Sequence, residues 1–161
     1  PVGFAFESIE DVLVHAKRSA EVSHNHPEGI KGAQATALAV FLARKEADNA
    51  TIRRQNETRF AYNLRCSVDD IRAGYRFDVS CQGSVPQSII AFLDSKDYAT
   101  AVKNAISLGG DADTMACIAG AIAQAYYKTM PADIVRQARR NLPEALLAVL
   151  NQFCERFDCP Y

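Results

Sequence analysis

A succession of apolar faces with the period of an α-helix is the strongest constraint on the fold. After Ser8, which opens a capping-box-like sequence, apolar residues recur every three or four positions and predict a helix over residues 8–22. The segment 29–47 is rich in Ala and Leu, which is typical of a buried central helix. Asp48 and Ser67 are candidate N-caps for a helix extending to about residue 63 and for a short helix after it.

The second half of the chain continues this pattern after one irregular stretch. Apolar and polar residues alternate over 75–81, which permits a brief extended segment, and Ser84 with Pro86 then predicts a helix N-terminus. Two helices should flank residues 109–114, and a last amphipathic helix should end near Phe157. A chain of 161 residues supports one core, so we expect a single all-α domain, an orthogonal multi-helix bundle.

Composition excludes several classes of partner. With 18 basic and 19 acidic side chains, the chain has no net field to attract nucleic acid or anionic lipid. The longest apolar run, residues 37–43, is far shorter than the roughly 20 residues of a membrane-spanning helix. The five cysteines are odd in number and lack CxxC spacing, which favours a reducing cytoplasm. We therefore expect a cytoplasmic protein that binds neither nucleic acid nor membranes.

The segment Gly109-Gly110-Asp111-Ala112-Asp113-Thr114 places two carboxylates and a hydroxyl between two helices. Mg²⁺ and Mn²⁺ prefer such oxygen ligands, whereas zinc favours the Cys and His that this segment lacks. A purely structural interpretation is also open, because the glycines can end one helix, Asp111 can cap the next, and Asp113 can interact with its N-terminal dipole. Spacing alone favours the structural interpretation.

Three segments together resemble the ADP-ribosylglycohydrolase family, whose members are all-helical enzymes that remove ADP-ribose from modified proteins or small molecules. The segments are 23–33 (SHNHPEGIKGA), 81–87 (CQGSVPQ) and 107–114 (SLGGDADT). A helix of small residues at 116–123 and the pair Tyr126-Tyr127 follow in the same order. Each motif is weak by itself, but their order and spacing make the resemblance specific over nearly the whole chain.

This resemblance implies that Asp111, Asp113 and Thr114 form the C-terminal half of a dinuclear Mg²⁺ or Mn²⁺ site, with both aspartates catalytic. In the family the metals bind the diol of the distal ribose and position the anomeric carbon and a water. His24 matches a histidine near the bound ADP-ribose, where it can donate to a pyrophosphate or ribose oxygen. From the residues alone, His24 and His26 are better explained as a polar loop, and we assign His26 a structural role.

The chain also departs from the family pattern. Members carry a second acidic motif and a Gly-rich pyrophosphate loop in an N-terminal half, and neither occurs in this sequence. We therefore expect residues 1–161 to be the C-terminal portion of the fold, with a separate N-terminal half or second chain completing the site. The expected substrate is an ADP-ribosylated protein or small molecule, and the alternative is a non-catalytic helical binding module. Ser84 and Gln82 could line the cleft, although an N-cap role explains Ser84 fully.

Overall fold

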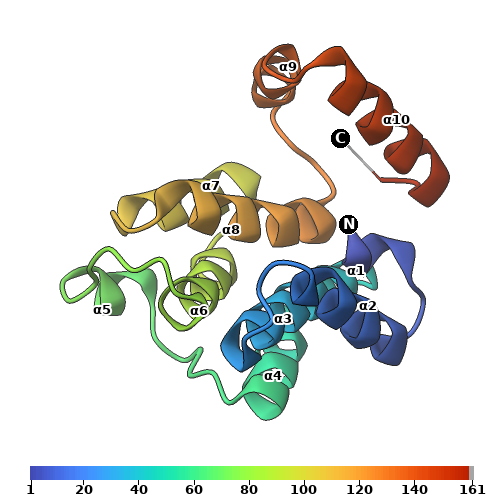
Figure 1. Ribbon diagram of the computed structural model, residues 1–161. Coiled ribbons are helices and arrows are strands. Elements are labelled where there is room, and N and C mark those ends of the chain that lie inside the picture. The colour runs from blue at the N-terminus through green and yellow to red at the C-terminus, as the bar shows by residue number, and fades with distance from the viewer. Residues whose placement is uncertain (160–161) are drawn as a thin grey trace.

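The computed structural model describes residues 1–159, and these residues form α-helices and loops without a β-strand (Figure 1). In chain order the helices are α1 (Val2–Ala5), α2 (Ile9–Glu21), α3 (Pro27–Arg44), α4 (Asn49–Phe60), α5 (Val68–Arg72), α6 (Cys81–Leu93), α7 (Tyr98–Ser107), α8 (Ala112–Tyr127), α9 (Ala132–Arg140) and α10 (Glu144–Phe157). The predicted all-α fold is confirmed. The four-residue α1 was not predicted.

Ser8, Asp48 and Ser67 cap α2, α4 and α5, as the sequence predicts. The Oγ of Ser8 accepts from the Asp11 amide at 3.0 Å, and a carboxylate oxygen of Asp48 accepts from the Thr51 amide at 2.8 Å. Helix α4 ends at Phe60, earlier than the predicted residue 63, because Ala61 adopts the left-handed conformation with φ 54°.

Helix α3 is displaced toward the N-terminus relative to its prediction, running over 27–44 instead of 29–47. His26 is its N-cap, and His26 Nδ1 accepts from the Glu28 amide at 3.2 Å. Pro27 then occupies the first helical position, where a missing N–H costs no hydrogen bond. His26 thus has the structural role that the sequence predicts for it.

The predicted start of α6 is wrong by one turn. Ser80 is the N-cap, and its Oγ accepts from the Gly83 amide at 3.1 Å. Ser84 is buried inside the helix, where its hydroxyl donates to the Ser80 carbonyl at 2.8 Å, so Ser84 does not cap it. Residues 75–79, predicted to permit an extended segment, form a loop without strand pairing.

The core lies around α3 and α8. Helix α3 packs against α1, α2, α4, α6 and α8, and α8 packs also against α6 and α7. Leu38 of α3, Phe92 of α6 and Ile122 of α8 are completely buried in this core. In contrast, α9 and α10 lie beyond the end of α8 (Figure 1), and α9 buries none of its residues.

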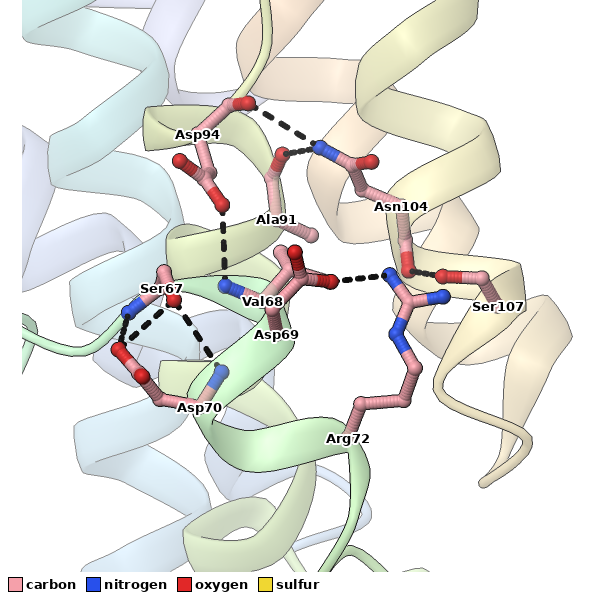
Figure 2. Close-up of polar contacts among 9 residues, drawn as sticks. All are labelled: Ser67, Val68, Asp69, Asp70, Arg72, Ala91, Asp94, Asn104 and Ser107. Atoms are coloured by element: carbon pink, nitrogen blue, oxygen red, sulfur yellow. Dashed lines mark hydrogen bonds and ion pairs between the residues drawn. The ribbon is translucent and has the colours of Figure 1, made fainter.

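The C-terminal end of α6 holds both α5 and α7 (Figure 2). The Val68 amide donates to the carboxylate of Asp94 at 3.0 Å, which attaches α5. Asn104 of α7 donates from Nδ2 to the carbonyls of Ala91 and Asp94, at 3.1 and 3.3 Å. These bonds attach α7, the helix that precedes the acidic segment, to the end of α6. Within residues 1–159, no helix has the length and apolar character needed to cross a membrane.

Candidate active site

The acidic segment forms the turn between α7 and α8. Gly109 has φ +73°, a left-handed conformation that ends the α7 backbone at little cost for glycine. Asp111 is at the N-cap position of α8, and within the described chain its side chain makes no capping hydrogen bond. Asp113 and Thr114 lie in the first turn. The capping explanation therefore fails for Asp111, whose carboxylate is not used to begin the helix.

Asp111 and Asp113 are close enough for their carboxylates to interact directly. A hydrogen bond with Asp111, followed by bonds from the amides of Thr114 and of Asp113 itself, holds the pKa of Asp113 below its usual range. Two carboxylates in contact need a shared proton or a cation between them, because like charges at this separation repel. This pair and the exposed Thr114 hydroxyl are all oxygen donors, which suits Mg²⁺ or Mn²⁺.

The donor set within this chain is incomplete. Over residues 1–159, no group of three or more His, Cys, Asp and Glu side chains is placed to hold a metal ion. Two carboxylates and a hydroxyl supply only part of the roughly six oxygens that Mg²⁺ requires. The residues fit one side of an oxygen-ligated centre.

A cleft of about 600 Å³ opens beside this turn. Asp111, Thr114 and His24 line it together, although His24 lies far from the other two in the sequence. Small residues of α2, α3 and α8 form much of the remaining wall, including Ala20, Gly32, Ala33, Ala37 and Ala121. Asp113 is exposed and is not among the described residues that line the cleft. The structure thus brings three of the four predicted site residues to one cavity.

His24 lies in the turn after α2, and its amide donates to the Ala20 carbonyl at 2.7 Å. Its Nδ1 is 2.8 Å from the hydroxyl of Ser23. When that hydroxyl donates to Nδ1, the ring proton resides on Nε2, which can then donate to a ligand oxygen. His24 also lines a second cavity of about 380 Å³ that includes Gln82, whereas Ser84 lines the larger cleft.

Tyr75 is a site residue that the sequence did not indicate. Its hydroxyl donates to the Gly83 carbonyl at 2.6 Å and is 3.3 Å from Met115 Sδ. Its ring covers Gly110 so closely that a Cβ there would be 2.3 Å from Tyr75 Cε1. Burial, with smaller effects of the negative charges of Asp78 and Asp111, raises the pKa of Tyr75. Gly110 was the sequence signal for this contact. Gly109 alone is enough to end α7, so the second glycine needs another reason, which is the space that the Tyr75 ring occupies.

Comparison with known proteins decides which family this arrangement represents. The ADP-ribosylglycohydrolase family model matches residues 1–159, which is the whole described chain. The chain belongs to the ADP-ribosylglycohydrolase family. The resemblance inferred from three motifs is thereby confirmed, as is the helical architecture that it implies.

Relatives within the ADP-ribosylglycohydrolase family are distant. Human ADP-ribosylhydrolase ARH3 is 28% identical over 171 aligned positions, which cover 78% of this chain and 47% of the human protein. The mouse protein of the same name is 27% identical, with 78% and 46% covered. An uncharacterized protein of Archaeoglobus fulgidus is 28% identical over 137 positions, with 76% and 45% covered. The chain spans about half the length of the curated relatives it matches.

Proposed function

We propose that this chain supplies one side of a dinuclear Mg²⁺ or Mn²⁺ centre in a hydrolase that cleaves the glycosidic bond of ADP-ribosylated proteins or small molecules. The observation that carries the proposal is that Asp111 and Thr114 line one cleft together with His24, which lies far from them in the sequence. A structural cap would have used the Asp111 carboxylate in α8, and it does not. Family membership supports the hydrolase class.

Asp111, Asp113 and Thr114 would hold the metal ions, with Asp111 and Thr114 on the cleft side. When bound, the ions supply Lewis acidity that suits a transition state with oxocarbenium character. In this role Asp111 and Asp113 would supply carboxylate oxygens to the metal side of the cleft. His24 donates from Nε2 to a pyrophosphate or ribose oxygen of the substrate, which fixes the substrate along the cleft.

The remaining metal ligands would come from a separate segment or chain, since three side chains cannot hold two ions firmly. This chain alone should therefore bind divalent metal weakly and hydrolyse little or no substrate. The five cysteines, all unpaired in the structure, suit a reducing compartment, and we place the protein in the cytoplasm.

Mn²⁺ titration followed by electron paramagnetic resonance tests the site directly. We expect weak binding to the wild-type chain and its loss in Asp111→Ala and Asp113→Ala. The matched control is Asp133→Ala, which removes another carboxylate from the first turn of a helix and should leave binding unchanged. Equal binding by wild type and by either site variant would show that these carboxylates hold no metal.

Release of ADP-ribose from an ADP-ribosylated peptide in Mg²⁺ tests the reaction. We expect little release by this chain alone and turnover when a longer product of the same coding sequence supplies the other ligands. Asp113→Ala in that longer product should abolish turnover while circular dichroism shows an unchanged helical content. Robust turnover by the isolated chain, or full activity of the variant, would refute the proposed division of the site.

A further inference from the structure

We infer that Tyr75 is a positioning residue for Asp111, because it holds the turn at Gly110 against α6. The consequence for metal binding rests on the proposed function of Asp111, whereas the hold on the turn does not. Tyr75 lies outside the acidic segment and comes from the loop between α5 and α6.

Tyr75 is itself fixed at two points. Its amide donates to the Ile71 carbonyl at 2.9 Å, at the end of α5. Helix α5 is in turn attached to α6 by the bond from the Val68 amide to Asp94 (Figure 2). At the other end of the side chain, the hydroxyl donates to the Gly83 carbonyl in the first turn of α6. A ring held in this way cannot move without breaking one of these bonds.

The fixed ring then restricts the acidic turn. Gly110 has only a hydrogen where other residues carry Cβ, and the Tyr75 ring and hydroxyl occupy the space that a Cβ would need. The same hydroxyl contacts Met115 Sδ, and Met115 is completely buried in α8. One side chain therefore contacts the turn and the first part of α8, on both sides of Asp111.

The position of the Asp111 carboxylate depends on the contact between Tyr75 and Gly110 more than the position of a capping carboxylate would. The Asp111 carboxylate makes no cap hydrogen bond within the described chain, so apart from its interaction with Asp113 the position of the carboxylate follows from the backbone of the turn. Because that backbone packs against Tyr75 at the preceding residue, loosening the ring should widen the range of positions available to the carboxylate. Pre-organised ligands bind more tightly, because less ordering is needed on binding.

The chain provides a matched control. Tyr127, at the opposite end of α8, donates from its hydroxyl to the Ser95 carbonyl at 2.7 Å. Tyr75→Phe removes the bond to the Gly83 carbonyl of α6 and Tyr127→Phe the bond to the Ser95 carbonyl, but only Tyr75 lies beside the turn that contains Asp111. Each should lower the thermal unfolding midpoint slightly, so thermal stability does not separate a positioning role from a structural one.

Amide hydrogen exchange without metal separates the two roles. The Gly109 amide donates to Ile106 and the Met115 amide to Asp111, at 3.1 and 2.9 Å, so both report on the turn. We expect Tyr75→Phe to accelerate exchange at these two amides by about fivefold, the equivalent of one ordinary hydrogen bond. Tyr127→Phe should leave them unchanged. Equal exchange in the two variants would overturn the inference.

A double-mutant cycle tests the ring contact itself. Gly110→Ala should accelerate exchange at the same amides and weaken Mn²⁺ binding by about fivefold or more in wild type. In a Tyr75→Ala background, where the ring is absent, the same Gly110→Ala change should have a much smaller effect. Equal effects in both backgrounds would show that the Tyr75 ring does not constrain Gly110.

Measurements of Mn²⁺ binding and of amide exchange distinguish a failure of the proposed metal centre from a failure of the positioning role. If wild type and Asp111→Ala bind Mn²⁺ equally, the proposed metal centre is wrong, and the exchange data still decide whether Tyr75 holds the turn. If Mn²⁺ binds at Asp111 but Tyr75→Phe changes neither its affinity nor exchange, the centre stands and the positioning role is wrong.

Discussion

At the scale of single residues, Asp111 separates the structural and functional interpretations of the acidic motif. A capping aspartate would accept hydrogen bonds from the first turn of its helix, as Asp48 does in α4. Asp111 instead interacts with Asp113, and both carboxylates lie where the α8 dipole favours negative charge. A residue that serves ligand binding and not folding can be replaced without destabilising the protein.

This difference predicts the stability of two variants. Asp111→Asn should leave the midpoint of thermal unfolding essentially unchanged, because it removes no capping bond. Ser8→Ala, which removes the cap of α2, should lower the midpoint by about 2–4 °C, equivalent to about 1 kcal/mol. Calorimetry of both variants without metal provides the comparison. A loss in Asp111→Asn as large as in Ser8→Ala would assign Asp111 a capping role after all.

At the scale of elements, α5 is a helix that its neighbours and its cap must stabilise. Five residues are too few for an independent helix in water. Ser67 and Asp70 form a capping box, in which the Asp70 carboxylate accepts from the Ser67 amide at 2.8 Å and from its hydroxyl at 2.7 Å (Figure 2). The position of Tyr75 follows from α5, so this cap also supports the acidic turn.

The capping box predicts a pH dependence. Bonds from the Ser67 amide and hydroxyl lower the pKa of Asp70 from 3.8. A carboxyl whose pKa is lowered by folding stabilises the native state above its ordinary value, and that contribution disappears as the pH falls through the lowered value. Wild type should therefore be more stable than Asp70→Asn at pH 7, and the difference should vanish in strong acid.

Thermal unfolding midpoints measured over this pH range provide the test. Asp69→Asn is the matched control, since Asp69 is the neighbouring carboxylate and forms only an exposed pair with Arg72 at 3.3 Å. Asp69→Asn should change the unfolding midpoint only slightly at every pH. If the midpoints of wild type and Asp70→Asn differ by the same amount at pH 7 and in strong acid, the ionised capping box is not the cause of that difference.

At the scale of the whole molecule, the last two helices stand apart from the main bundle. Helix α9 buries no residue, and Leu146 and Val149 of α10 are 55% and 63% exposed. Cys154 is the buried residue of α10, and Phe153 and Phe157, whose rings are 4.6 Å apart, pack partly buried against the core. One apolar part of α10 is thus left in contact with solvent.

Exposed apolar residues on one helix favour association between molecules. The double variant Leu146→Gln/Val149→Gln should reduce self-association in sedimentation-velocity experiments at high protein concentration without lowering the unfolding midpoint. Val14→Gln, which changes a 46%-exposed valine on α2, is the control and should leave association unchanged. Unchanged sedimentation of the double variant would show that this face of α10 mediates no contact between molecules.

The sequence by itself determined the helical class, the starts of α2, α4, α5 and α8, and the residues of the acidic turn. These features depend on contacts between residues close in the sequence, such as the bond from the Asp11 amide to Ser8 and the apolar period of α2. The family resemblance rested on local motifs for the same reason. At the start of α6 the sequence prediction was wrong, because it assigned the N-cap to Ser84 and the structure assigns it to Ser80.

The tertiary structure alone decided what surrounds the acidic turn. His24 reaches the cleft of Asp111 because α2 and α3 pack together and α3 packs against α8. Tyr75 covers Gly110 because α5 is attached to α6 and α6 packs against α8. No periodicity or cap within one segment encodes such contacts, because their free energy comes from apolar burial between helices distant in the chain. The sequence thus specified the residues of the acidic turn, and helix packing set the cavity and the side chain beside it.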